Sequence, residues 1–358
     1  MSDLDRLYDR INEENRPHLE GAFPREQSID RRRQGRGVIF EGDDGVFTQS
    51  WFPICRSSEL PAGKVLGSNF LDGQVVAFRD ADGIANVVSA YCPHNGANLA
   101  QGDLVGGELR CAFHHWCFDG KGSCTRTGSG DPVPPRAKLF KYPTVERYGL
   151  VWAFNGEEPL WHLPDLGLPD EELTFHADIP HIDLLADPWV FMCNTLDFNH
   201  VKCLHGIDID GDDPAEDIVW APHSVSYDLT GIFRETGARI SYSLAIHGSN
   251  IFLQTGEANG RWFAFLFPLG LLRPGTQRCY FIIATRKSDG TPEDDAKVQE
   301  TLDFAMKLER FVVSQDIGVL NSIRFTRGQF TRSDKALSKF LDHIARFPRA
   351  HPGAAHIR

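Results

Sequence analysis

The amino-acid sequence predicts an α+β protein with two domains, an all-β domain followed by a domain that combines an antiparallel sheet with helices. Two observations predict this organisation. Between Phe47 and Phe154 short apolar runs alternate with turn residues, whereas the second half mixes strand-like runs with segments of helical periodicity. The length of 358 residues also favours more than one domain.

The first 45 residues precede the predicted β domain. Leu4, Leu7 and Ile11 recur at helical spacing and predict a short helix within residues 1–20. A segment rich in glycine and arginine then extends to about Gly45. We therefore expect residues 1–45 to form a helix and an arm.

The β domain is expected over residues 46–157. Its clearest strands lie at Val75–Phe78, Ile84–Tyr91 and Tyr148–Phe154. Turn residues such as Asp80-Ala81-Asp82-Gly83 separate these runs, which is typical of antiparallel sheets. The proline-rich stretch at 158–164 predicts a linker to the second domain.

The second domain is expected over residues 158–345, followed by a C-terminal tail at 346–358. One helix is predicted over about 188–204, and a long helix from Thr291, a capping residue that precedes a proline. Strand-like runs lie at Ile251–Thr255, Trp262–Phe267 and Tyr280–Thr285. The first two flank an Ala-Asn-Gly turn and predict a hairpin.

The composition excludes several classes of function. A net charge of −12 indicates that neither nucleic acid nor an anionic membrane is a partner. No run reaches the roughly 18 apolar residues that span a bilayer, and the polar N-terminus has no secretory apolar region. The eight scattered cysteines predict reduced thiols and a cytoplasmic protein. Without a G-x-G-x-x-G fingerprint, no bound NAD or flavin is expected.

The most specific motif is a pair of short cysteine–histidine segments. Cys92 and His94 form C-x-H, and Cys111 and His114 form C-x-x-H after sixteen intervening residues. Two thiolates and two imidazoles are the ligands of a Rieske-type [2Fe–2S] cluster. A structural zinc site takes the same ligand set, but zinc fingers usually keep the two cysteines together. The mixed order favours the iron–sulfur cluster.

A second group of polar residues predicts a mononuclear metal site. Asn194, Asp197 and His200 are three apart and would share one face of a helix. His205 is five residues further, so the helix must end near Lys202 if both imidazoles bind one metal. Two such histidines favour the 2-His-1-carboxylate triad of non-haem Fe(II) oxygenases.

The missing carboxylate is expected on the long C-terminal helix. Asp316 falls in the middle of an apolar stripe on a helical projection, where an unpaired carboxylate is costly unless it binds metal. The stripe consists of Val298, Leu302, Ala305 and Val312. Asp303 lies off this stripe, and Glu309 lies closer to it without further support. An acid exposed at the end of the helix is the alternative for Asp316.

With both motifs in hand, the chain resembles the terminal oxygenase (α) component of the Rieske non-haem iron aromatic-ring-hydroxylating oxygenases over roughly residues 46–345. The family's cluster pattern is matched by Cys92, His94, Cys111, His114, Trp116, Phe118, Asp119 and Gly122. Its N-x-x-D-x-x-H-x-x-x-x-H pattern is matched by Asn194, Asp197, His200 and His205. Asp316 resembles the family's carboxylate ligand. His115 stands where glycine is common and is not expected to be a ligand.

The resemblance implies a Rieske domain, a helix-grip-like catalytic domain and a homotrimer of the short type without a β subunit. It implies that electrons from NAD(P)H pass through a reductase, often with a ferredoxin, to the cluster and then to the iron. His114 would hydrogen-bond Asp197 of a neighbouring subunit, so that Asp197 bridges the two centres. Asn194 would lie behind the iron ligands and support them.

The resemblance also implies a class of reaction. A small organic substrate, apolar and aromatic or alicyclic, would be monohydroxylated or oxidatively N- or O-dealkylated with O₂, or would be an amine that is oxidised. The strands that carry Phe252, Trp262, Phe263, Phe265 and Phe267 would supply an apolar wall, and the alternative is that these side chains only form core. The alternatives are a Rieske electron-transfer protein with a non-catalytic second site and a zinc-bound structural protein.

Overall fold

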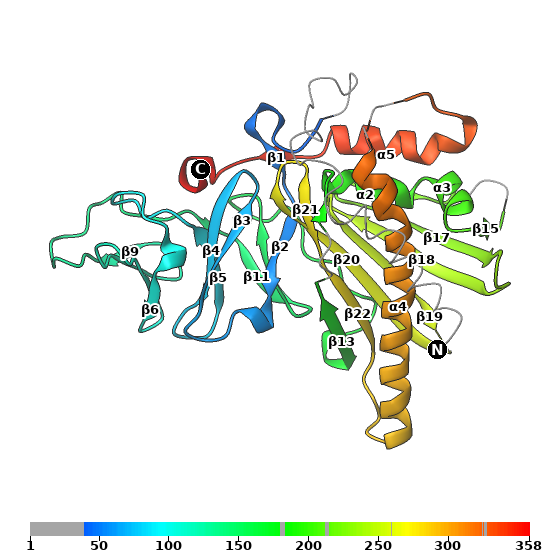
Figure 1. Cartoon of the computed structure of the whole chain (residues 1–358), viewed down its shortest axis with the longest axis horizontal. Helices are drawn as coiled ribbons and strands as arrows, with labels where there is room; N and C mark the ends of the chain where they lie inside the picture. Colours follow the sequence, from blue (N-terminus) through cyan, green and yellow to red (C-terminus); the bar gives the residue numbers. More distant parts are fainter. Residues whose placement is uncertain (1–38, 180–182, 212–214, 259, 324, 326–327) are drawn as a thin grey trace. The chain divides into compact units, whose positions relative to one another are not determined.

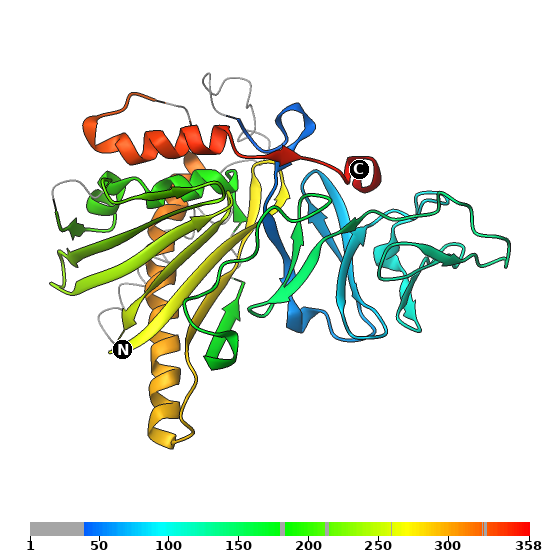
Figure 2. The same cartoon turned by 180° about the vertical axis from the view of Figure 1, so that it is seen from behind.

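The computed structural model describes residues 39–358 except 180–182, 212–214, 259, 324 and 326–327. The predicted N-terminal helix and nearly all of the arm lie outside the described residues. The rest forms two compact units. The first contains Glu41–His162, Gly270–Pro274 and Pro348–Arg358, and the second contains Leu163–Leu269 and Gly275–Phe347. Sheets dominate both, and long helices occur in the second (Figures 1 and 2), which confirms the α+β class.

The first unit is built from short antiparallel sheets. One has the order β10-β5-β4-β3, a second β11-β12-β2, a third β6-β7-β8-β9, and β1 pairs with β23. The strands are β1 (Phe47–Thr48), β2 (Trp51–Arg56), β3 (Val65–Phe70), β4 (Gly73–Arg79), β5 (Ala85–Ser89), β6 (Asp103–Val105), β7 (Glu108–Arg110), β8 (Cys117–Phe118), β9 (Cys124–Arg126), β10 (Lys141–Tyr142), β11 (Thr144–Arg147), β12 (Leu150–Phe154) and β23 (Arg349–Ala350), with helix α6 (Ala354–Ile357). The strands predicted near 75–78, 84–91 and 148–154 are confirmed as β4, β5 and β12.

A buried asparagine joins the C-terminal segment to the first unit. Asn155 Nδ2 donates to the carbonyl oxygens of Phe47, Thr48 and Ala350 at 3.2, 3.0 and 2.9 Å. Its carboxamide thereby fixes β1 and β23 beside the end of β12. Because Phe47 and Thr48 are buried, their carbonyl groups need a donor within the protein.

The second unit is a large antiparallel sheet with helices. Its main order is β13-β22-β20-β19-β18-β17-β15, and β14, β16 and β21 pair beside it. The elements are β13 (Leu173–Asp178), β14 (Asp183–Leu184), α2 (Pro188–Thr195), α3 (Phe198–Cys203), β15 (Ile207–Ile209), β16 (Val219–Ala221), β17 (Ser224–Phe233), β18 (Arg239–His247), β19 (Ile251–Ala258), β20 (Arg261–Arg273), β21 (Thr276–Cys279), β22 (Phe281–Arg286), α4 (Pro292–Ser322) and α5 (Lys335–Ala345). The predicted hairpin is confirmed, since β19 pairs with β20 from Ile251 opposite Pro268 to Ala258 opposite Arg261.

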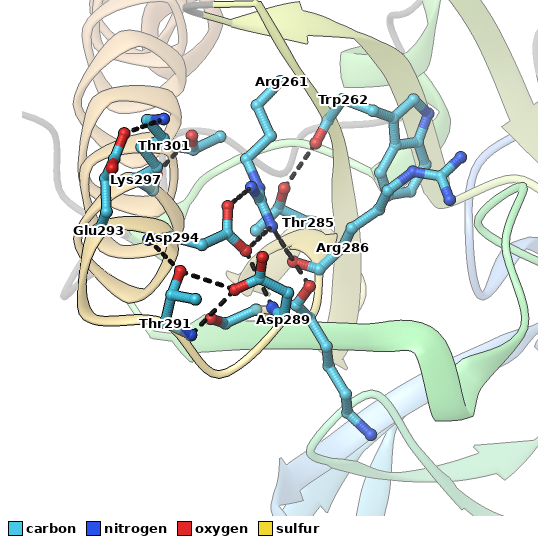
Figure 3. Close-up of polar contacts among 12 residues, drawn as sticks. Arg261, Trp262, Thr285, Arg286, Asp289, Thr291, Glu293, Asp294, Lys297 and Thr301 are labelled. Carbon is cyan, nitrogen blue, oxygen red and sulfur yellow. Dashed lines mark hydrogen bonds and ion pairs between the residues drawn. The ribbon is translucent and has the colours of Figure 1, made fainter.

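Helix α4 begins where the sequence predicts. The Thr291 hydroxyl accepts a hydrogen bond from the Asp294 N–H, and Pro292 occupies the first turn. Arg261 of β20 reaches Asp294 with a 2.7 Å ion pair (Figure 3), so the start of the helix is tied to the sheet. One face of α4 is buried from Leu302 to Leu320. This docking holds Asp316 at a fixed place on the sheet. None of the described helices is both long and apolar enough to cross a bilayer.

The single helix predicted over about 188–204 is wrong, because the structure has two short helices, α2 and α3. Asp197 between them has non-helical backbone angles (φ −93°, ψ 84°), and its carboxylate accepts a 3.0 Å hydrogen bond from the His200 N–H. Asp197 is therefore the N-cap of α3. For this reason Asn194, Asp197 and His200 do not share one helical face. The chain leaves α3 after Cys203, close to the point expected from the histidine spacing.

Candidate metal centres

The two predicted cluster segments form loops of the same design. In the first, Cys92 N–H donates to Ala97 O, and Cys92 O accepts from Gly96 N–H, both at 2.9 Å. In the second, Cys111 N–H donates to Trp116 O at 2.8 Å, and Cys111 O accepts from His115 N–H at 3.0 Å. Each loop thus folds back onto its own cysteine.

The matching design of the two loops sets the backbone conformation at position 115. Gly96 and His115 occupy equivalent places, four residues after a cysteine, and both have left-handed backbones with φ of 74° and 54°. Such angles favour glycine, so His115 is accommodated with some strain. The fold of this loop requires a positive φ at position 115.

The four predicted cluster residues are divided by exposure. Cys92 and Cys111 are buried, whereas His94 and His114 are exposed, with their ring centroids 4.6 Å apart. His94 also stacks on Trp116 at 4.5 Å with nearly parallel planes. The two thiols therefore face the interior of the first unit, and the two imidazoles face solvent.

The electrostatics of the thiols fit a bound cluster. Burial raises the pKa of the Cys92 thiol to about 12, and the adjacent Cys111 acts in the same direction. The backbone N–H of His94, bonded to the Cys92 sulfur, lowers the pKa in part. A thiolate in this position needs a cation beside it, and iron ligation supplies one.

The structure brings together His200, His205 and Asp316. His200 Nε2 lies 2.7 Å and His205 Nε2 lies 3.4 Å from Asp316 Oδ1. The two imidazole rings have centroids 4.5 Å apart at 76°, so they present different edges to one point. The candidate ligand atoms of the three residues all lie within 4.8 Å of one another. Two imidazoles and one carboxylate can thus bind a single divalent ion.

Burial makes this group dependent on a counter-charge. The Asp316 side chain is 5% exposed, and no Lys or Arg bonds it within the described residues. Burial lowers the pKa of His200, but the hydrogen bond and charge of Asp316 outweigh it and leave that pKa raised. In His205 burial prevails and the pKa is lowered. A bound metal would satisfy the carboxylate without protonating either ring.

Two oxygen atoms orient the imidazoles. His200 Nδ1 lies 3.1 Å from the carbonyl oxygen of Asn194, and His205 Nδ1 lies 2.8 Å from Gln315 Oε1. Because these oxygens can only accept, each Nδ1 carries a proton, and Nε2, the atom turned toward Asp316, is the one that would bind a metal. Asn194 thus orients His200 through its backbone carbonyl oxygen.

An apolar cavity opens beside this group. Its lining is mainly apolar with a few polar groups, as is typical of small-molecule sites. The aromatic and aliphatic part of the lining includes Phe191, Ile240, Leu244, Phe252, Phe265 and Phe267. His200, His205 and Asp316 belong to the same lining, so a molecule in the cavity would lie against the metal ligands.

Comparison with known proteins agrees with these observations. Residues 50–143 match the Rieske [2Fe-2S] domain. Over 339 residues the chain is 26% identical to cholesterol 7-desaturase nvd of Bombyx mori, covering 85% of this chain and 70% of that protein. It is 29% identical over 283 residues to 4beta-methylsterol monooxygenase of Methylococcus capsulatus, covering 71% of each. Several other curated relatives match over less than half of their own length.

Solved structures show the same fold. NdmA of Pseudomonas putida CBB5 with caffeine superposes with a TM-score of 0.65 at 17% identity, covering 84% of this chain and 95% of that one. Residues 50–143 are a Rieske [2Fe–2S] domain, and relatives that match most of the chain are Rieske non-haem iron oxygenases. Oxygenases of this type are oxidoreductases with a [2Fe–2S] cluster and a mononuclear iron. The predicted family, enzyme class and cofactors are therefore confirmed.

Three side chains of this Rieske oxygenase were not assigned a role from the sequence. Gln315 orients His205, and Gln254 and Glu309 are polar groups in the cavity. For Gln315, its position directly before Asp316 was the sequence feature that could have indicated a role at the metal site. Glu309 lies two helical turns before Asp316 on the same face, which indicated burial but not a partner. Gln254 lies in a strand, and no sequence pattern distinguishes it.

Replacing Gln315 with leucine is expected to weaken iron binding at the mononuclear centre of the oxygenase. Without the acceptor for Nδ1–H, His205 loses its fixed tautomer and orientation, which typically costs about 10- to 100-fold in metal affinity. The measurement is the iron content relative to cluster absorbance during chelator titration. Gln299→Leu, at an exposed position of α4, is the matched control. Equal iron retention in both variants would contradict this role for Gln315.

Glu309→Gln is expected to change how stability depends on pH. Burial raises the pKa of Glu309 from about 4.5 to about 8, although the hydrogen bond from Gln254 acts in the opposite direction. The folded state therefore binds this proton more tightly than the unfolded state, and the wild type loses stability as pH rises from about 4.5 to about 8. The glutamine variant lacks this loss.

The Tm difference between Glu309→Gln and wild type should accordingly increase between pH 5 and pH 8. Differential scanning calorimetry of the holoenzyme measures it. Glu300→Gln, on the exposed side of α4, should show no such change. A Tm difference that is constant with pH would mean that Glu309 titrates near its ordinary range.

Proposed function

We propose that this chain is a terminal oxygenase that takes electrons from a separate reductase or ferredoxin and uses O₂ to monohydroxylate or oxidatively dealkylate an apolar organic substrate. One observation carries the proposal: the two histidines and Asp316 line one apolar cavity, so a molecule bound there would lie against the proposed metal ligands. We assign the cluster to a Rieske domain at 46–157 and the iron to a catalytic domain at 158–345.

The residues proposed to hold the cofactors fit them. Cys92, His94, Cys111 and His114 offer the thiolate and imidazole donors of the cluster, and the buried thiols need its positive charge. His200, His205 and Asp316 would hold the iron as two imidazoles and one carboxylate, a ligand set that leaves open positions for O₂. When bound, the iron supplies the activation of O₂.

The protein itself contributes binding and exclusion of water. Phe252, Phe265 and Phe267 cover the cavity with apolar surface, and burial of substrate against them would remove water from the reacting centre. The histidine tautomers are fixed before any metal enters, because Asn194 O and Gln315 accept from the Nδ1 atoms. Preorganised ligands of this kind bind metal more tightly.

We further propose that Asp197 connects the two centres between subunits of a homotrimer. One carboxylate oxygen of Asp197 caps α3, and within the described part of the chain its other oxygen has no hydrogen-bond partner. His114 is exposed on the first unit. An imidazole N–H of a neighbouring subunit's His114 could therefore bind the free oxygen. This contact would place Asp197 between the cluster and His200, which its charge already reaches.

The substrate class is an apolar aromatic or alicyclic compound. The curated relatives are described as acting on cholesterol and on a methylsterol, and one structural neighbour holds caffeine. The cavity lining supports this class, since its exposed surface is mainly apolar. An electron carrier is the second candidate, but it would need neither the cavity nor the three metal ligands.

A single turnover under ¹⁸O₂ tests the proposal. Reduced, iron-replete protein is mixed with arenes, aryl amines, steroids and N-alkyl or methoxy compounds, and products are identified by mass spectrometry. We expect a labelled product or one that has lost an alkyl group. His205→Ala should retain the cluster spectrum and form no product. If that variant and wild type both transfer electrons at equal rates and neither forms product, the chain is an electron carrier.

Asp197→Asn tests the connection between the centres. Asparagine caps a helix as well as aspartate does, so α3 and both metal centres should remain intact. We expect turnover to fall by at least two orders of magnitude, because the anionic bridge to His114 is lost. The measurements are metal content, cluster spectrum and the rate of cluster reoxidation with substrate. A fully active variant would remove Asp197 from the electron path.

A further inference from the structure

Glu309 and Gln254 form a polar pair inside the otherwise apolar cavity. Gln254 Nε2 donates a hydrogen bond to Glu309 Oε1 at 2.7 Å. Both side chains line the cavity, and they are only 4% and 7% exposed. The cross-strand neighbours of Gln254 are Leu244 and Phe265, so its amide interrupts an apolar row. A carboxyl group in such surroundings is costly unless its hydrogen bonds are satisfied.

The pair has hydrogen-bonding capacity that the protein does not use. Within the described part of the chain, the Gln254–Glu309 bond is the one hydrogen bond between these side chains and any protein group. Glu309 Oε2 and Gln254 Oε1 are therefore available to a molecule in the cavity. Because unpaired buried polar groups lower stability, a ligand that satisfies them gains affinity.

Tyr242 belongs to the same polar end of the cavity. It lies opposite Gly256 in the β18–β19 pairing, and a Cβ at position 256 would come within 2.5 Å of the tyrosine ring. Glycine thus leaves room for the ring beside Gln254. Burial raises the pKa of the Tyr242 hydroxyl, and the charge of nearby Glu309 adds to the effect. The phenol is accordingly neutral and close to the carboxyl group.

This polar end is separated from the metal ligands by a defined distance. Glu309 and Asp316 are seven residues apart on α4, which is about two turns and about 10 Å along the helix axis. Both side chains lie on the face of α4 that lines the cavity. The cavity therefore has a polar end at Glu309 and a reacting end at Asp316.

We propose that Glu309 and Gln254 anchor the substrate by binding a hydroxyl group of an otherwise apolar molecule. This inference rests on the proposed function of the cavity as the substrate site of an oxygenase. A hydroxyl group donates one hydrogen bond and accepts another, which matches the free Gln254 Oε1 and the carboxyl group of Glu309. The oxidised atom then lies several bonds from the anchored hydroxyl group, at the Asp316 end.

An uncharged hydroxyl group fits this site better than an ammonium group. Because burial raises the pKa of Glu309 to about 8, its carboxyl group is mainly protonated at neutral pH. It then carries no charge to pair with a cation, and it can both donate and accept. Within the described residues, no Lys or Arg bonds to Glu309.

Equilibrium dialysis of the holoenzyme at pH 7 tests the anchor without turnover. The probes are two matched pairs, pregnenolone with its 3-deoxy analogue and 1-adamantanol with adamantane. We expect wild type to bind the hydroxylated member of at least one pair about tenfold more tightly. In Glu309→Leu and Gln254→Leu the ratio should fall to near one, whereas Glu300→Gln on the exposed face should retain it.

One further variant keeps the result interpretable. Glu309→Gln preserves side-chain size and hydrogen bonding, so partial retention of the preference shows that the leucine variants fail through lost bonds rather than misfolding. Circular dichroism and the cluster spectrum check folding. An unchanged ratio in folded Glu309→Leu, or no binding of either hydroxyl probe to wild type, overturns the proposal. Tighter binding of a 3-amino analogue that Glu309→Gln abolishes would mean that the anchor binds a cation, and the hydroxyl class would be wrong.

The experiment also separates this inference from the proposed function. His205→Ala leaves Glu309 and Gln254 intact, so it should keep the hydroxyl preference and lose product formation. If wild type forms no product from any substrate but retains the preference, the anchor stands and the oxygenase proposal fails. If product forms and the preference is absent, the oxygenase proposal stands and the anchor fails.

Discussion

The structure of the second unit depends on bringing a buried carboxylate to two imidazoles. Asp316 lies on the long helix α4, more than one hundred residues after His200 and His205, and its Oδ1 is 2.7 and 3.4 Å from their Nε2 atoms. Such an acid is destabilising in an apolar interior unless a cation or hydrogen bonds compensate. The helix must therefore dock in one register on the sheet, and the cap at Thr291 and the Arg261–Asp294 pair fix one end of it.

The end of α3 serves the same geometry. A helix that continued past Cys203 would point His200 and His205 about 140° apart, because they are five residues apart. Because α3 begins at the Asp197 cap and ends at Cys203, both imidazoles can turn toward one point. One carboxylate oxygen of Asp197 caps α3, and the other is proposed to contact a neighbouring subunit.

In the first unit, two short loops carry the two cysteines and two histidines of the proposed cluster site. Each loop closes on its own cysteine with a matching pair of backbone hydrogen bonds, so its shape depends little on the rest of the molecule. Burial of the thiols and exposure of the histidines give the site two unlike sides. If these residues hold the cluster as we propose, the exposed imidazoles offer the side at which electrons could enter or leave.

Features that depend on short spacings can be predicted from the sequence alone. Local chemistry and periodicity predict the two cysteine–histidine motifs, the strands around 75–78 and 251–267, the start of α4 and the burial of Asp316. Which distant side chains meet depends instead on tertiary packing. Gln315 against His205, Gln254 against Glu309, and the helix break at Asp197 depend on how α4 packs on the sheet and on a cap. Periodicity assigns a residue to a face, but it does not say which residue of another element lies opposite.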